Sequence, residues 1–172
     1  PADCPGSGTP LTGWGWSDNV GWISLNCSDV SSCATRNYAL RKNTSNKIVG
    51  FAWSENIGWI SANASDLSGC PSGTCEASVS SLGRVSGWMK ALNATGGWDG
   101  WISLNGTNYQ TMVESDNTLS NWAWGSDVTG WILWSAQLSC AQTAGDFCSG
   151  NSWQHRHPNC TVTTIITDCG VS

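Results

Sequence analysis

The stretch Gly13–Ser24, GWGWSDNVGWIS, decides the fold because the chain repeats it. It returns as GFAWSENIGWIS at Gly50–Ser61, as SGWMKALNATGGWDGWIS with an insertion at Ser86–Ser103, and as NWAWGSDVTGWILWS at Asn121–Ser135, and we call these stretches copies one to four. Self-similarity at a period of about 20–50 residues is typical of chains that repeat one supersecondary unit, whose apolar faces are buried only by stacking on neighbours. The sequence therefore predicts one cooperative repeat domain over 13–135, with an N-terminal arm (1–12) before it and a disulfide-rich C-terminal extension (136–172) after it.

The composition favours an all-β fold. Only 11% of the 172 residues are charged, and Gly, Ser, Thr and Asn outnumber the good helix formers. Each copy reads as strand, polar turn and strand, and an alternating segment precedes it, so we expect antiparallel three-stranded meanders. The expected strands of copy two are Asn37–Arg41, Lys47–Trp53 and Trp59–Asn63; the outer strands of copies three and four are Glu76–Ser80 and Tyr109–Glu114.

The alternation within each copy predicts which side chains share a face. In copy one, Ile23 and Leu25 point one way while Trp22, Ser24 and Asn26 point the other; in copy three, Ile102 and Leu104 alternate with Trp101, Ser103 and Asn105 in the same manner. We expect the Ile and Leu row to fill a central core, and the small residues of the preceding strand, Gly50 and Ala52, to receive tryptophan rings. The Trp98-Asp99-Gly100-Trp101 segment of copy three predicts a tight hairpin.

Thirteen tryptophans allow two interpretations. Most are expected to be repeat architecture, packing as cross-strand aromatic pairs in place of aliphatic residues. The alternative is a row of exposed indoles on which sugar rings stack. The positions assigned to the repeat are Trp16, Trp22, Trp53, Trp59, Trp101, Trp124 and Trp131, of which Trp22, Trp59, Trp101 and Trp131 are expected to be equivalent.

Nine cysteines without a CxxC pattern indicate an oxidising compartment and a secreted protein. Pairing of nearest neighbours predicts the disulfides Cys27–Cys33, Cys70–Cys75, Cys140–Cys148 and Cys160–Cys169, and leaves Cys4 over. Cys4 is then available for a bond to another molecule or as a blocked thiol; the alternative is that it pairs internally and another cysteine is left free.

Other constellations point less clearly to a site. Asn-x-Ser/Thr triplets mark possible glycan acceptors at Asn26, Asn43, Asn63, Asn93, Asn105 and Asn159. The acidic residues that recur at the hairpin turns, Asp18, Glu55, Asp99 and Asp127, are expected to cap turns rather than bind calcium, and His155 and His157, with Asp146 or Asp168, are expected to form a solvated loop rather than a metal site. No nucleophile and base pattern marks a catalytic site, so we expect neither an enzyme nor a cofactor. The net charge of −5 disfavours nucleic-acid binding, and no apolar run reaches the length of a membrane span.

The phrases AWSENIGWIS (Ala52–Ser61) and GWGWSDNVGWIS (Gly13–Ser24) resemble a Trp-rich repeat of secreted and cell-surface bacterial proteins, of the form G-x-A-W-[SG]-E-N-I-G-W-[IV]. The resemblance spans about 13–135 and weakens in copies three and four. It implies an extracytoplasmic β-repeat module of surface or appendage proteins, without an enzymatic activity.

Two functions follow as hypotheses. The first is a structural subunit of an extracellular filament, pilus-like appendage or surface layer, which assembles with itself or with other surface proteins through its terminal segments. Pro1–Pro10 or the β-branched Thr161–Thr167 would make the contacts, and exposed edge strands of an open repeat array would receive them. The alternative is that Thr161–Thr167 closes the sheet of its own chain and that the arm is disordered. The second is a secreted carbohydrate-binding or adhesin module that uses exposed tryptophans.

Overall fold

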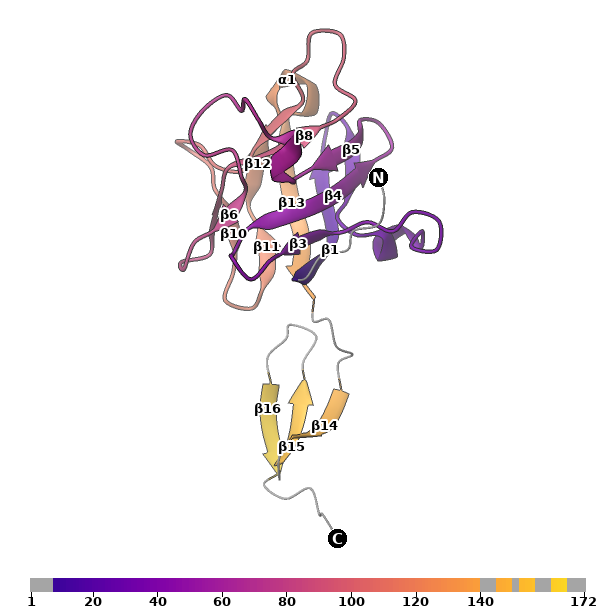
Figure 1. Ribbon diagram of the computed structural model, residues 1–172, viewed down its shortest axis with the longest axis vertical. Coiled ribbons are helices and arrows are strands. Elements are labelled where there is room, and N and C mark those ends of the chain that lie inside the picture. The colour runs from indigo at the N-terminus through magenta and orange to yellow at the C-terminus, as the bar shows by residue number, and fades with distance from the viewer. Residues whose placement is uncertain (1–7, 140–144, 150–151, 157–161, 167–172) are drawn as a thin grey trace.

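The computed structural model describes residues 8–139 and the backbone of 145–149, 152–156 and 162–166 (Figure 1). Thirteen strands form one antiparallel sheet that closes into a barrel, and three more form a separate sheet in the order β14, β15, β16. The all-β prediction is therefore confirmed. The barrel strands are β1 (Thr9–Ser17), β2 (Gly21–Ser24), β3 (Leu40–Lys42), β4 (Ile48–Ser54), β5 (Gly58–Ser61), β6 (Ser78–Val79), β7 (Arg84–Ser86), β8 (Trp88–Ala91), β9 (Trp101–Ser103), β10 (Thr111–Val113), β11 (Thr118–Ser120), β12 (Trp122–Trp124) and β13 (Trp131–Leu138).

The remaining elements are short. The 3₁₀ turns η1 (Cys27–Val30) and η2 (Ala64–Asp66) lie after copies one and two, and α1 (Ser126–Thr129) forms the turn of copy four. The separate sheet consists of β14 (Gly145–Ser149), β15 (Ser152–Arg156) and β16 (Val162–Ile166). Thr161–Thr167 thus contains the expected strand, and this strand pairs with β15 of its own chain.

Long, bent strands alternate with shorter ones around the barrel. The long ones are β1, β4, β7 continued by β8, and β11 continued by β12. Between β1 and β4 lie β2 and β3, each paired with both neighbours. In the same way, β5 and β6 lie between β4 and the β7–β8 strand, and β9 and β10 lie between β7–β8 and the β11–β12 strand. Between β11–β12 and β1 there is only β13. Each copy therefore contributes one quarter of the barrel.

The first and last copies close the barrel. β1 and β13 pair from Leu11 opposite Leu138 to Trp16 opposite Leu133. The expected open array with exposed edge strands is therefore wrong for this sheet, because copy four carries no loop after its GWI strand and continues straight along β1. The boundaries shift accordingly: Thr9–Thr12, expected in the arm, belong to β1, and β13 continues to Leu138.

The long strands bend at residues with positive φ. Gly13, Gly50, Gly87 and Asn121 have φ of 108°, 100°, 101° and 66°. At Gly50 a Cβ would lie 2.1 Å from the carbonyl oxygen of Ala39. A side chain is therefore excluded by the close approach of the next strand as well as by the backbone conformation.

The core is built in layers of one residue from each copy. The innermost layer is the isoleucine of every GWI phrase, and each isoleucine faces a small or flexible residue on the preceding strand: Ile23 and Gly15, Ile60 and Ala52, Ile102 and Met89, Ile132 and Ala123. All four isoleucines are fully buried, and two further layers are buried as well: Leu25, Ala62, Leu104 and Trp134, and Leu11, Ile48, Val85 and Leu119. The Ile and Leu core is thus confirmed. A cavity lined by residues of these layers has a volume of only about 20 Å³, which is too small for a ligand.

The small residues have a different role from the one expected. Ala52 packs in the interior opposite Ile60, and Gly50 receives the backbone of Ala39. Gly15, by contrast, lies against the indole of Trp134, whose ring would be 2.7 Å from a Cβ at that position. The expected hairpin at Trp98–Trp101 is also wrong, because β8 ends at Ala91 and a loop of residues 92–100 leads to β9.

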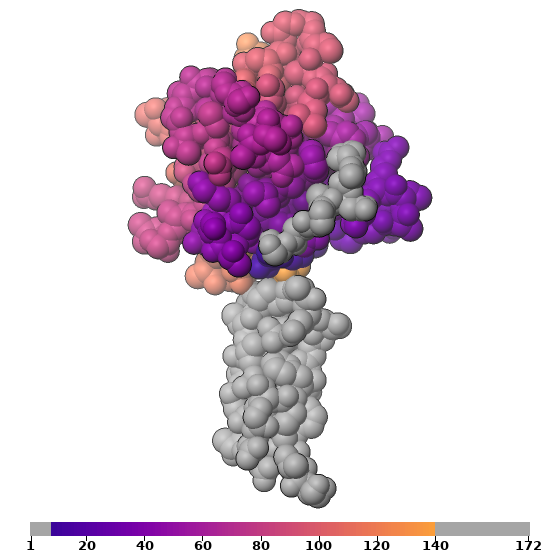
Figure 2. Space-filling model, viewed as in Figure 1, coloured from indigo at the N-terminus to yellow at the C-terminus, as the bar shows by residue number. Residues whose placement is uncertain are grey.

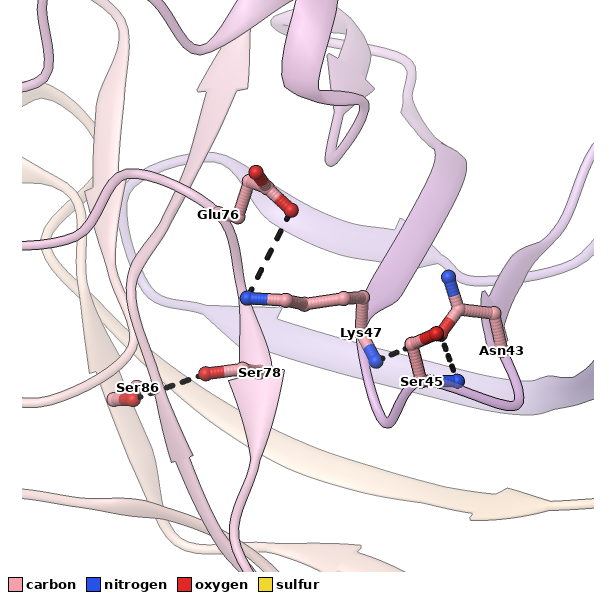
Figure 3. A network of polar contacts seen from close by, with 6 residues as sticks. All are labelled: Asn43, Ser45, Lys47, Glu76, Ser78 and Ser86. Carbon is pink, nitrogen blue, oxygen red and sulfur yellow. Dashed lines mark hydrogen bonds and ion pairs between the residues drawn. The ribbon is translucent and has the colours of Figure 1, made fainter.

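Between copies two and three, β6 docks beside the start of β4 (Figure 3). Ile48 N donates to Ala77 O and Val79 N donates to Asn46 O. Lys47 and Glu76 lie 3.8 Å apart across this junction, with both side chains partly exposed, so this ion pair adds little to stability. Figure 2 shows mainly copies two and three and the connections before and between them, in purple, magenta and pink, whereas orange segments are seen only at the margins.

Two disulfides close loops that leave the barrel. Cys27–Cys33 and Cys70–Cys75 form as predicted, in the connections after β2 and β5. They are typical of an oxidising compartment outside the cytoplasm. Cys4, Cys140, Cys160 and Cys169 lie outside the described residues, and Cys148 is described only as a backbone position of β14.

Candidate binding site: an exposed tryptophan belt

Each copy presents the same aromatic cluster on the outside of the barrel. The GWI tryptophan packs against two side chains of the preceding strand that are two residues apart and therefore share its face. The clusters are Trp14, Trp16 and Trp22; Phe51, Trp53 and Trp59; Trp88, Lys90 and Trp101; and Trp122, Trp124 and Trp131. We call these twelve residues the tryptophan belt.

The geometry of the clusters is nearly constant. The directly opposed pairs Trp16 with Trp22 and Trp53 with Trp59 both have centroids 4.7 Å apart and rings inclined at 61°. In copy four the corresponding pair, Trp124 with Trp131, has values of 4.8 Å and 56°. In copy three Lys90 takes this position, with its Nζ 4.5 Å from the centroid of Trp101. The expected equivalence of Trp22, Trp59, Trp101 and Trp131 is therefore confirmed.

The belt faces outward because the isoleucine next to each GWI tryptophan faces inward. The cross-strand aromatic pairs form as expected, but most of their rings are not buried. Among the twelve described tryptophans only Trp101 and Trp134 are buried. The most exposed are Trp22 (57%), Trp131 (47%), Trp122 (43%) and Trp16 (39%), and all four belong to copies one and four. Large apolar side chains that stay exposed in a row mark interaction surfaces.

Copies two and three are partly covered by the chain itself. The guanidinium of Arg36, in the loop after η1, lies 5.1 Å from the Trp53 centroid, and the Tyr38 ring packs edge-on against Trp59 at 5.1 Å. Lys90 covers Trp101 in the same way. Tyr109 contacts Trp131 in copy four at 5.1 Å, yet Trp131 remains about half exposed.

A groove of about 390 Å³ lies where copy four meets copy one. We call it the seam groove; its lining is Trp16, Asp18, Asn19, Trp122, Trp124, Asp127, Gly130, Trp131 and Leu133. The β1–β13 ladder sets its floor by placing Trp16 opposite Leu133. The two turns at its end are tied together, since Asn19 Nδ2 donates to Asp127 O at 3.0 Å and the Ser17 hydroxyl donates to Thr129 O.

The polar residues of the seam groove are acidic or neutral. The carboxylate of Asp18 accepts a hydrogen bond from Trp16 Nε1 at 2.9 Å, which fixes both side chains at the rim. Asp127 lies in the first turn of α1. Among the described residues, the lining contains no lysine, arginine or histidine.

A larger hollow, about 800 Å³, is lined mainly by turn residues of copies two, three and four. Only two indoles contribute to it, Trp53 and Trp98, and neither is among the most exposed tryptophans. The seam groove is therefore the stronger candidate, because it alone combines several exposed rings with polar groups at the rim.

Of the acidic turn residues that were expected to cap turns, Asp99 accepts the backbone N–H of Trp101 at 3.2 Å, whereas Asp18 and Glu55 accept the indole N–H groups of Trp16 and Trp53. Within the described part of the chain, no three His, Cys, Asp or Glu side chains are grouped to hold a metal ion. Of the expected histidine cluster, His155 and Asp146 are described as backbone only, whereas His157 and Asp168 lie outside the described residues.

The candidate glycan acceptors differ in access. Asn26 is buried and its Nδ2 donates to Leu11 O at 3.0 Å, so a glycan there is incompatible with the folded barrel. Asn63 and Asn105 use Oδ1 to accept the N–H of Gly50 and Gly87, and Asn43 Oδ1 accepts the N–H of Ser45 and Lys47, which leaves their Nδ2 groups outside these bonds. Asn93 is exposed, and Asn159 lies outside the described residues.

Sequence reasoning missed part of the seam groove. Asn19, Trp122 and Leu133 line it but were not singled out as site residues. The period-two pattern places Trp122 on the same face as Trp124, so one signal was present. The proximity of copy four to copy one, however, depends on barrel closure.

Comparison with protein-family models, with curated proteins and with solved structures gives no match to this chain. Within the described residues, no helix has the length and apolar character needed to cross a membrane.

Proposed function

We propose that the protein is a non-enzymatic, extracellular carbohydrate-binding module whose ligand lies in the seam groove. The observation that carries the proposal is the gathering of Trp16, Trp122, Trp124 and Trp131 in one groove, beside the exposed belt ring of Trp22. Binding sites for small molecules and chains are mostly apolar with a few polar groups that set orientation, and this lining has that composition.

The indoles supply the apolar part of such a site. An indole presents a flat, rigid surface with few rotatable bonds, so little conformational entropy is lost when a sugar ring stacks on it. Asp18, Asn19 and Asp127 at the rim supply acceptors and a donor for hydroxyl groups. The disulfides and the resemblance to repeats of secreted proteins support an extracellular site of action.

The filament hypothesis remains a prediction. Its proposed contacts lie in Pro1–Pro10 and the C-terminal segment, most of which is outside the described residues. The barrel itself supports it less than the sequence suggested, because β1 and β13 are paired with each other and accept no added strand.

A matched pair of variants tests the carbohydrate site. Trp122→Ala removes an exposed ring of the seam groove, and Trp88→Ala removes the ring at the equivalent position of copy three. A panel of soluble glycan oligomers is titrated against each protein, and binding is followed by indole fluorescence and calorimetry. We expect W122A to weaken binding at least about tenfold, as truncation of a central aromatic contact does, and W88A to bind as the native chain does.

Thermal unfolding of both variants serves as the control for folding. Absence of binding by the native protein across neutral, basic and acidic glycans would contradict the proposal. So would an equal loss of affinity in W88A, since that result would place the effect in the fold rather than in the groove.

A further inference from the structure

We propose that the seam groove recognises a glycan with protonated amines, that is, a polymer of amino sugars. This inference rests on the proposed carbohydrate function and names the ligand class of that site. It is drawn from how the chain itself covers the other parts of the belt.

Copies two and three show what the belt binds within its own chain. The partner of Trp53 is the Arg36 guanidinium at 5.1 Å, and the partner of Trp101 is the Lys90 ammonium at 4.5 Å. Indole faces attract cations through their quadrupole, most strongly when water is excluded. Two of the four copies thus carry a cation against a tryptophan of the belt.

Copies one and four have no such cation among the described residues. The two cation–π contacts found there both belong to copies two and three. The four tryptophans that remain most exposed are in copies one and four, on either side of the seam. The clusters correspond in register and ring geometry, so Trp16 and Trp124 are the counterparts of Trp53. No cation among the described residues covers them as Arg36 covers Trp53.

Charge in the groove favours the same ligand. The lining carries the carboxylates of Asp18 and Asp127 and no basic side chain. Asp18 is held at the rim by Trp16 Nε1, and the turn that carries Asp127 is held by Asn19. An amine that enters over the indoles therefore meets two carboxylates, whereas an acidic sugar would meet like charges.

A polymer of amino sugars satisfies both features. Its rings present C–H faces that stack on indoles, and its amines reach the carboxylates at the rim. N-acetylation removes the positive charge but keeps the sugar backbone, which gives a ligand pair that differs mainly in charge.

The experiment uses the full chain with glucosamine oligomers and N-acetylglucosamine oligomers of the same length, at mildly acidic pH and at low and high salt. The test variant is the double substitution D18N/D127N, which keeps an acceptor for Trp16 Nε1. The control is Glu55→Gln, which changes charge at the position of copy two that corresponds to Asp18 and likewise accepts an indole N–H.

We expect the glucosamine oligomer to bind at least about tenfold more tightly than the acetylated one at low salt, and this preference to shrink at high salt. D18N/D127N abolishes the preference, and E55Q retains it. Equal or tighter binding of the acetylated oligomer, or an unchanged preference in D18N/D127N, overturns the inference and leaves the carbohydrate function standing. Failure of both oligomers overturns the inference, and failure of the whole glycan panel overturns the proposed function as well. Binding of a lysine-rich peptide without binding of either oligomer would assign the groove to a protein partner and overturn both.

Discussion

Single residues determine how the same twelve-residue phrase is used in each copy. The position that holds Trp16, Trp53 and Trp124 holds Lys90 in copy three, and an aromatic pair becomes a cation–π pair at almost the same distance. The position after each GWI tryptophan is always isoleucine, and it is fully buried in every copy. One alternation therefore sets both the core and the outward belt.

The pH dependence of stability is expected to involve Asp29. Burial raises the pKa of this carboxyl above its ordinary value of 3.8, although the N–H of Gly13 donates to its Oδ1 at 3.0 Å and opposes the shift. The folded state therefore favours the protonated form, and this contribution to stability is full below the ordinary pKa and is lost as the pH rises through the folded pKa. Asp29→Asn keeps the acceptor without the charge, so we expect it to raise the free energy of unfolding at neutral pH and to have no such advantage in strong acid.

Urea unfolding at neutral and acidic pH measures the effect of Asp29→Asn. Asp116→Asn is the comparison of opposite sign, because hydrogen bonds from the Thr118 hydroxyl and N–H lower the pKa of the exposed Asp116 carboxyl. The contribution of Asp116 to the stability of the folded state is present above its ordinary pKa and is lost as the pH falls. A D29N variant that is less stable than the native chain at neutral pH would contradict the assignment.

At the scale of elements, the bend in each long strand allows that strand to pair with two different strands along the same edge. β4 pairs with β3 up to Gly50. Beyond Gly50 the same edge of β4 pairs with β2, because the chain changes direction at that residue. The carbonyl of Gly50 accepts a hydrogen bond from the N–H of Ala62, and the N–H of Gly50 donates to Asn63 Oδ1. The equivalent bonds at Gly87 come from Leu104 and go to Asn105, so the bend is a repeated, hydrogen-bonded unit.

The bend gives a test of element stability. Gly50→Ala places a methyl group 2.1 Å from Ala39 O in a backbone with φ of 100°, so we expect a loss of at least about 2–3 kcal/mol in the free energy of unfolding. Gly69→Ala is the matched control, because Gly69 also has positive φ (76°) but no atom within 4 Å of the added Cβ. Chemical denaturation compares the two, and similar losses would show that backbone strain alone accounts for the effect.

At the scale of the whole molecule, β13 joins the two ends of the repeat array and fills the core beneath the joint. Ile132 and Trp134 point into the barrel while Trp131 and Leu133 point out. Trp134 covers Gly15 of β1 and donates from Nε1 to the hydroxyl of Thr111 in β10 at 3.1 Å, so it ties β13 to both strands. One face of β13 thus forms the floor of the seam groove, and its other face makes the contact that closes the core.

We expect Trp134→Ala to cost about 3–5 kcal/mol, the range for removal of a buried large aromatic side chain. Trp131→Ala, in the same strand but half exposed, is expected to cost much less and to reduce glycan binding instead. Thermal unfolding together with the glycan titration separates the two effects. Equal destabilisation by both substitutions would contradict the division of β13 into a core face and a binding face.

The sequence by itself determined the repeat, the all-β class, the strands of copy two to within a few residues, the Ile and Leu core and two disulfides. These features depend on local pattern: period two along a strand, turn residues between strands, and cysteines five or six residues apart. Barrel closure was decided only by the tertiary structure, because the pairing of Leu11 with Leu138 joins residues far apart in the chain. Closure also decided which tryptophans stay exposed. Alternation shows that Trp16 and Trp131 leave the core face, but the groove between them exists only because copy four lies beside copy one.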